Sequence, residues 1–83
     1  MNTAIEVMVY YLENTSDIEQ QEMGINIDLS QCILKKYKLY HVDYVTHYDG
    51  TRCVVSSAGI DFIVDESYDS LNKRIEDQKY RLN

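Results

Sequence analysis

The chain has 83 residues, a mass of 9.8 kDa and a formal net charge of −6 at pH 7, and this length suffices for one hydrophobic core but not for two. Hydrophobic residues make up 45% of the chain and charged residues 27%, which excludes wholesale disorder, collagen-like repeats and coiled coils. No run approaches the ~20 apolar residues of a membrane-spanning helix, and the first residues lack the basic and apolar parts of a secretory signal. We therefore expect a single domain over residues 1–83, located in the cytoplasm, with both cysteines reduced.

The N-terminal part of the chain predicts a strand followed by an acidic loop. Residues 4–12 have strand composition with apolar side chains on both faces, which predicts a central position in a sheet. Residues 13–24 are polar and acidic and predict a loop with one or two helical turns. Ser16 lies three residues before Glu19, as in a capping box, and Gly24 is a suitable helix stop.

The next segment is less clear. Residues 25–29 alternate between apolar and polar side chains, which predicts a short strand. For residues 30–37 the pattern fits a helical turn as well as a continuing strand, and periodicity does not decide between them.

The segment 39–64 predicts a β-hairpin. Asp49-Gly50 lies between two strand-like runs and tolerates the positive φ angles of a two-residue type I′ turn. With these two residues as the loop, Tyr44 pairs with Val55, and every other pair follows from that register.

A second tight turn is expected at Ala58-Gly59, where it would pair Val55 with Phe62. The two turns together assign each side chain to a face. The predicted core face consists of Val42, Tyr44, Thr46, Cys53, Val55, Ile60, Phe62 and Val64. The opposite face is predicted to carry His41, Asp43, Val45, His47, Arg52, Val54, Ser56, Asp61 and Ile63, with an apolar centre of Val45, Val54 and Ile63.

The chain ends in a segment that predicts a helix from about Tyr68 to Leu82, with Ser67 as its N-cap. An apolar stripe runs along this segment through Tyr68, Leu71, Ile75, Lys79 and Leu82. The expected fold class is therefore α+β: a small antiparallel sheet of four or five strands with a C-terminal amphipathic helix packed on one face.

Motifs of catalysis and cofactor binding are missing from the sequence. The three glycines, at 24, 50 and 59, cannot form the glycine-rich phosphate-binding loops. A strand would hold His41 and His47 roughly 20 Å apart, too far to share a metal ion. In the predicted register Cys53 and His47 point to opposite faces, which argues against a Cys–His pair for catalysis. We expect no catalytic residue, no metal and no cofactor, and hence no enzyme.

Charge and tyrosine content give the leading indication of function. Residues 1–31 carry six acidic residues and no lysine or arginine, whereas residues 32–54 carry a net charge of +2. An acidic surface repels nucleic-acid phosphates and attracts basic proteins, although charge of this size also serves solubility. Eight tyrosines are too many for so small a core, so some should be exposed, where tyrosine favours protein contacts or simply suits strands. The expected partner-binding residues are Glu13, Asp17, Glu19, Glu22, Tyr10, Tyr11, Tyr37 and Tyr40.

Three short motifs between Gly24 and Ile75 carry a resemblance to a known family. They are Ile25-Asn26 with Ile27 and Leu29, Thr51-Arg52-Cys53-Val54 leading to Gly59, and Phe62-Ile63-Val64-Asp65-Glu66-Ser67 running into Leu71 and Ile75. Together they resemble the β-rich pattern of the flagellar FlbD family and of small phage proteins built alike. The resemblance implies a small antiparallel sheet that ends in a helix, and it offers no catalytic residue. The chain differs from the pattern in its acidity and in residues 1–23, which add a strand and an acidic loop.

In size, acidity and tyrosine content the chain is also similar to small phage-encoded inhibitors of bacterial defence systems, including anti-CRISPR proteins. We therefore expect a non-enzymatic acidic module, an inhibitor from a phage or mobile element, that occupies a basic surface of a nucleic-acid-binding host protein. We expect no membrane contact, and direct nucleic-acid binding is disfavoured. The alternative is a structural or regulatory homo-oligomer, such as a homodimer, formed through a sheet edge or the Val45–Val54–Ile63 face. A third hypothesis is a small-molecule or single-stranded RNA binder that uses Lys35, Lys36 and Tyr37.

Overall fold

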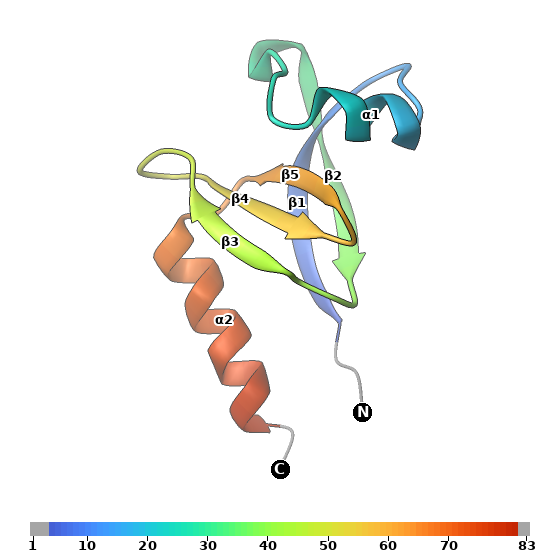
Figure 1. Cartoon of the computed structure of the whole chain (residues 1–83). Coiled ribbons are helices and arrows are strands. Elements are labelled where there is room, and N and C mark those ends of the chain that lie inside the picture. The colour runs from blue at the N-terminus through green and yellow to red at the C-terminus, as the bar shows by residue number, and fades with distance from the viewer. Residues whose placement is uncertain (1–3, 82–83) are drawn as a thin grey trace.

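The computed structural model describes residues 4–81, and the side chains of residues 4–78. The elements are β1 (Ile5–Leu12), α1 (Asp17–Met23), a short 3-10 turn η1 (Leu29–Gln31), β2 (Cys32–Leu39), β3 (Tyr44–His47), β4 (Cys53–Ser57), β5 (Ile60–Val64) and α2 (Tyr68–Arg81). The five strands form one antiparallel sheet in the order β2-β1-β5-β4-β3. In Figure 1, α1 lies above the sheet and α2 lies below it, beside β3. The predicted α+β class, with a C-terminal helix against an antiparallel sheet, is confirmed.

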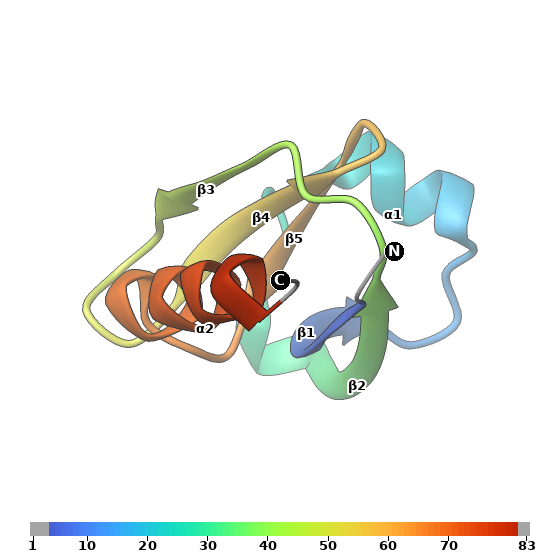
Figure 2. The ribbon, with the colours of Figure 1, turned by 90° about the horizontal axis from the view of Figure 1, so that it is seen from below.

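The sheet consists of a two-stranded ribbon and a three-stranded meander. β1 and β2 pair along their whole length, from Ile5 opposite Leu39 to Leu12 opposite Cys32. β1 and β5 share the single register pair Val9–Val64, which the Asp65 N–H supports by donating to the Met8 carbonyl at 2.8 Å. Viewed from below, the ribbon diverges from the meander, and α2 runs beneath the meander (Figure 2).

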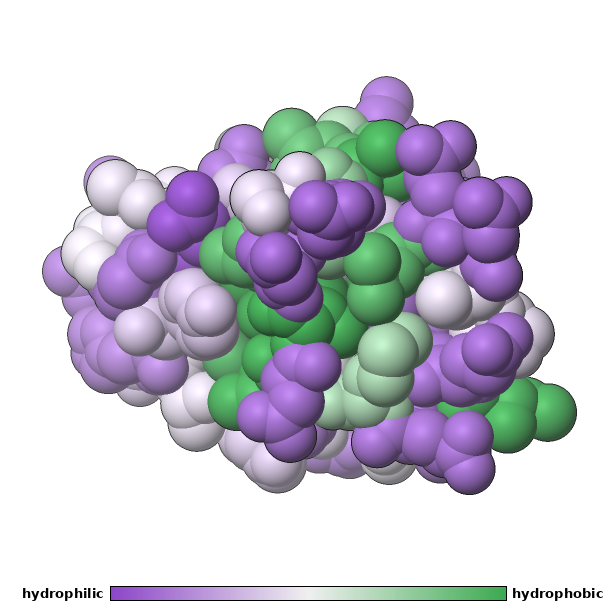
Figure 3. All heavy atoms as spheres, turned by 90° about the horizontal axis from the view of Figure 1, so that it is seen from above, coloured by the Kyte–Doolittle hydropathy of each residue, from purple (hydrophilic) through white to green (hydrophobic). Residues whose placement is uncertain are grey.

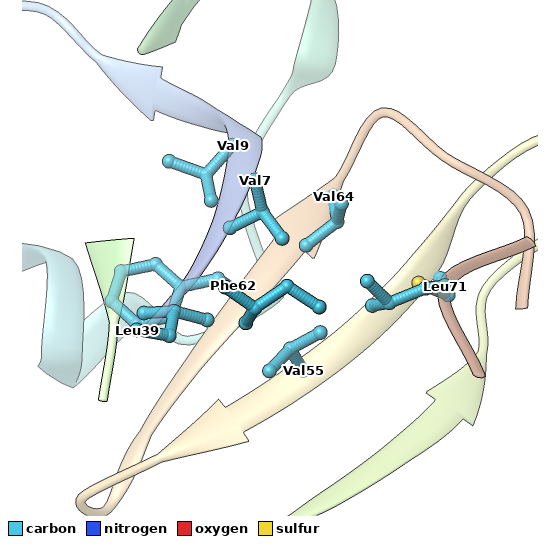
Figure 4. Packing of buried hydrophobic residues seen from close by; sticks show 9 residues of the cluster. Val7, Val9, Leu39, Val55, Phe62, Val64 and Leu71 are labelled. Atoms are coloured by element: carbon cyan, nitrogen blue, oxygen red, sulfur yellow. The ribbon is translucent and has the colours of Figure 1, made fainter. Parts of the chain in front are cut away.

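The core lies between the sheet and α2. Alternation in β1 buries Ile5, Val7 and Val9, and Val9 is completely buried. Leu71 of α2, 1% exposed, joins the cluster of buried residues formed by the strands, and Figure 4 shows how these side chains converge. Burial of each such side chain stabilises the fold by roughly 1.5–3 kcal/mol. The members of the cluster are Ile5, Val7, Val9, Leu39, Cys53, Val55, Phe62, Val64 and Leu71.

The predicted ends of the two helices agree with the structure within the described residues. α1 ends at Met23 and is followed by Gly24 at φ 57°, and the capping box between Ser16 and Glu19 is present. Ser67 accepts a hydrogen bond from the Ser70 N–H at 3.2 Å, as expected of an N-cap for α2. Leu82 lies outside the described residues.

The short strand predicted at residues 25–29 is wrong. This stretch is an irregular connection that leads into η1, where Asp28 accepts a hydrogen bond from the Ser30 N–H at 3.0 Å. The local hydrogen bond of an aspartate competes with strand pairing, so alternation alone was misleading here. For residues 30–37, which the sequence left open, the structure shows the end of η1 followed by β2.

The register predicted for the first hairpin is also wrong, by one residue. Tyr44 pairs with Ser56 and Val45 pairs with Val55, because residues 48–52 form a longer loop. Neither Asp49 nor Gly50 has the positive φ that a type I′ turn requires.

Asp49 builds this longer loop with its side chain. Its carboxylate accepts a hydrogen bond from the Thr51 N–H at 2.9 Å and pairs with the Arg52 guanidinium at 2.7 Å. The second turn is as predicted, since Ala58 and Gly59 both have positive φ, and Val55 pairs with Phe62.

The register shift moves β3 side chains to different faces, because a slip by one residue turns every side chain over. Val45 packs against the core, whereas Tyr44 is 53% exposed. The predicted apolar surface of Val45, Val54 and Ile63 does not form, because Val45 leaves it and Val54 and Ile63 are buried.

Candidate functional site

The acidic segment between β1 and β2 projects its carboxylates into solvent. Glu13, Asp17, Glu19 and Glu22 are all exposed, and the last three belong to α1. The capping box explains why this short stretch is helical: Glu19 N–H donates to the Ser16 hydroxyl at 3.2 Å, and Ser16 N–H donates to the Glu19 carboxylate at 3.0 Å. The helix therefore holds Asp17, Glu19 and Glu22 in a fixed arrangement, and Glu13 precedes it. Seen from the side of α1, the surface carries hydrophilic side chains around a hydrophobic centre (Figure 3).

These acids form no ion pair with another described side chain. The three ion pairs among the described side chains are His41–Asp43, Arg52–Asp49 and Arg74–Glu66, and none involves the acidic segment. Residues 13–28 also contain no lysine or arginine. Their negative charge is therefore directed towards solvent.

The predicted tyrosine clusters are only partly exposed. Tyr40 is 68% exposed, but Tyr11 is 7% exposed and belongs to the core. Tyr37 is half-buried, with its ring centroid 5.2 Å from that of Phe62. Burial raises the pKa of Tyr11, and it raises the pKa of Tyr37 to about 12. Exposed Tyr10–Tyr11 and Tyr37–Tyr40 pairs are therefore not formed, and of these four residues Tyr40 is the open one.

The Tyr11 hydroxyl contacts the acidic segment at Thr15 and Asp17. It lies 3.1 Å from both the Thr15 carbonyl and the Asp17 carboxylate, to which it can donate. The Asp17 contact, after burial, contributes to the raised pKa of Tyr11. Two of the predicted binding residues therefore act on each other, and Tyr11 positions α1 rather than a partner.

Tyr10 takes part in a polar network that the sequence did not indicate. The Arg52 Nε donates to the Tyr10 hydroxyl at 2.9 Å, and that hydroxyl donates to Asp65 at 3.0 Å. The guanidinium of Arg52 also pairs with Asp49, and the contacts with Tyr10 and then Asp49 raise the pKa of Arg52. Because Tyr10 and Arg52 are 42 residues apart, no local sequence signal could have predicted their contact.

The relation of Cys53 to His47 differs from the prediction. The two residues are directly opposite each other in the β3–β4 pair and thus share a face. Cys53 is nevertheless completely buried, and its burial, followed by the charge of Glu66, raises the pKa of its thiol to about 11. The His47 ring stacks on Tyr68 at 3.9 Å. Cys53 is therefore a protonated core residue at neutral pH rather than a thiolate nucleophile.

The described part of the chain lacks two further features. It holds no group of three or more His, Cys, Asp or Glu side chains arranged to bind a metal ion. No helix within residues 4–81 is long and apolar enough to cross a membrane. His41 contacts Asp43 at 2.6 Å, apart from His47 on β3.

Comparison with protein-family models, curated proteins and solved structures gave no match. The candidate site is therefore defined by geometry and charge: the exposed carboxylates of Glu13, Asp17, Glu19 and Glu22 on and beside α1.

Proposed function

We propose that the chain is a non-enzymatic binding module whose acidic segment occupies a basic surface of a nucleic-acid-binding protein, in the manner of small phage-encoded inhibitors. The observation that supports it best is the exposure of Glu13, Asp17, Glu19 and Glu22 on a segment without a single cation. Carboxylates held on a short helix can replace nucleic-acid phosphates in a basic channel.

The internal hydrogen bonds of the segment divide the four acids into two kinds. Asp17 and Glu19 accept hydrogen bonds that hold α1 in place. Glu13 and Glu22 are exposed and make no side-chain hydrogen bond to another described residue. We therefore assign Glu13 and Glu22 the direct contact with the partner, while Asp17 and Glu19 maintain the shape of the segment.

The test compares charge reversals at two places on the surface. The double variant Glu13→Lys/Glu22→Lys changes the acidic segment, and the control Glu76→Lys/Asp77→Lys makes the same change in charge at exposed positions of α2. Each protein is immobilised and incubated with bacterial lysate, and retained proteins are eluted with a salt gradient. The retained partner is then purified, and its binding to each variant and to nucleic acid is measured by competition.

The proposal expects a nucleic-acid-binding partner that the wild-type protein displaces from its nucleic acid. Reversal at Glu13 and Glu22 should weaken binding by at least about tenfold at low salt, whereas the α2 control should change it much less. Equal binding by both double variants would refute the proposal. Recovery of the protein alone, with a solution mass of two or more chains, would favour the homo-oligomer instead.

A further inference from the structure

Strand β2 forms one margin of the sheet and is free on its outer side. It is the first strand in the order β2-β1-β5-β4-β3, and Figure 2 shows it at the rim of the molecule. With eight residues it is as long as β1, and most of its side chains are exposed. An edge of this length offers unpaired backbone groups to another extended chain.

The backbone groups that point outward can be identified from the neighbouring pair. Asp65 N–H donates to the Met8 carbonyl, so Met8 points towards β5 and not towards its partner in β2, Lys36. In an antiparallel pair, residues alternate between those that bond to the neighbour and those that point away from it. Lys36 therefore directs its N–H and C=O away from β1, and so do Leu34 and Lys38.

Cys32 also directs its N–H and C=O away from β1, but its N–H is already hydrogen-bonded. Its N–H donates to the Leu29 carbonyl at the end of η1. The free edge consequently begins at Leu34 and extends to Lys38. None of the hydrogen bonds found between strands, turns and side chains of the described residues engages the outward groups of Leu34, Lys36 and Lys38.

The side chains along this edge are positively charged. Lys35, Lys36 and Lys38 are exposed, and none lies within 4.0 Å of a described carboxylate oxygen. Lys36 and Lys38 share a face with Leu34, which is 44% exposed, and Lys35 points to the other face, where its ammonium lies 4.4 Å from the centre of the Tyr11 ring. In the β1–β2 register Lys38 lies opposite Glu6, whereas Lys36 lies opposite Met8. The edge therefore combines free backbone groups with lysines that form no ion pair.

This chemistry selects among the possible occupants. A second copy of β2 in antiparallel pairing about Lys35, Lys36 or Tyr37 would bring lysines directly opposite each other, which is destabilising. A single-stranded nucleic acid bound along β2 would need an open aromatic ring within the strand for stacking, whereas Tyr37, the aromatic residue of β2, packs its ring on Phe62. We propose that β2 binds an extended acidic peptide segment of another protein by antiparallel strand addition, with carboxylates opposite Lys36 and Lys38.

The probe is an acetylated and amidated peptide of alternating threonine and glutamate, as long as β2. Directly opposed residues share a face, and those opposite Lys36 and Lys38 exchange hydrogen bonds with them. N-methylation of the glutamate amides therefore blocks the paired edge of the peptide, whereas N-methylation of the threonine amides alters only the far edge. A peptide with lysine in place of glutamate controls for charge. Binding is followed by titrating the amide resonances of the full-length protein with each peptide.

The expected result has three parts. The acidic peptide binds and slows amide exchange at Leu34, Lys36 and Lys38. Methylation at glutamate abolishes binding, and methylation at threonine leaves it nearly unchanged. The substitution Lys36→Glu weakens binding roughly fivefold at low salt, while Lys73→Glu on the exposed side of α2 has little effect.

Three results would overturn the proposal. The first is no binding of the acidic peptide beyond that of the lysine peptide. The second is equal binding of both methylated peptides, which indicates ionic attraction without strand addition. The third is binding of oligouridylate, but not of the peptide, with sensitivity to Lys36→Glu. Because these measurements leave Glu13 and Glu22 unchanged, failure here does not affect the function proposed for the acidic segment.

Discussion

The two helices are attached to the sheet by opposite means. α2 inserts an apolar side chain, Leu71, into the core, and Arg74 adds a link to Glu66 and to the Glu6 carbonyl. α1 has seven residues, and its one buried side chain is polar: Gln20 is 2% exposed. The comparison shows that an apolar helix face supplies stability and can be recognised in a sequence, whereas α1 depends on local hydrogen bonds and carries the exposed charge.

The largest difference between the helices should appear on truncation of Leu71. Leu71→Ala leaves a cavity among Cys53, Val55 and Val64 and should lower the free energy of unfolding by about 2–5 kcal/mol. Urea unfolding followed by circular dichroism measures the loss. The exposed neighbour Lys73→Ala is the control and should change stability little. A loss under about 1 kcal/mol for Leu71→Ala would mean that α2 is not anchored through the core.

The second prediction concerns the polar link of α2 and its pH dependence. Burial would raise the pKa of Glu66, but hydrogen bonds from Arg74 and Ser70 outweigh it and hold the pKa below its ordinary value. Such a group stabilises the fold above its unfolded pKa of about 4.3, and this contribution disappears as the pH falls through the folded value. Arg74→Met should cost about 1–2 kcal/mol at neutral pH, a figure reduced for the partial exposure of the arginine.

Unfolding free energies measured from pH 7 to pH 2 test this link. The wild-type protein should lose the contribution of Glu66 in acid, whereas Arg74→Met should have a flatter acid limb. Lys73→Met removes a charge without removing the link and is the matched control. Parallel curves for the wild-type protein and Arg74→Met would show that the pair does not stabilise the fold.

The third prediction is that removing the buried amide of Gln20 in α1 makes the protein more stable. Neither the Nε2 nor the Oε1 of Gln20 has a hydrogen-bond partner among the described residues. Gln20→Met keeps the length of the side chain and removes the unpaired polar atoms, so it should stabilise the fold by about 1 kcal/mol. Thermal and urea unfolding measure the change, with Gln21→Met at an exposed position as the control. A loss of stability specific to Gln20→Met would show that the amide is paired in solution.

The smallest effect is expected at the cap of α1. Ser16→Ala removes the acceptor for the Glu19 N–H and should cost about 0.5–1 kcal/mol. Ser16→Asp retains an acceptor and should preserve both stability and the amide protection of α1. Hydrogen exchange of the α1 amides is the sensitive measurement, and unchanged exchange in Ser16→Ala would show that the capping box does not maintain this helix.

Local patterns in the sequence determined much of the fold. The central strand at residues 4–12, the cap and stop of α1, the Ala58-Gly59 turn and the helix around Leu71 were predicted from neighbouring residues, and the structure agrees with each. The acidic residues of the candidate site lie at the surface, as charged side chains usually do, and their role in binding stays a prediction. The exposure of the tyrosines was not predicted correctly, because it depends on packing: Tyr11 is in the core, whereas Tyr40 is exposed.

The tertiary structure decided what local patterns leave open. Asp49-Gly50 is compatible with a tight turn, but the bond from Arg52 to Tyr10 of β1 and the hydrogen bonds of Asp49 accompany a longer loop. That loop shifts the register by one residue, so Val45 rather than Tyr44 reaches the core. Strand order is likewise set by distant contacts, and it alone makes β2 an edge with outward-pointing backbone groups. The physical reason is that residues adjacent in the chain determine turns and helices, whereas register and edges depend on which distant side chains pack together.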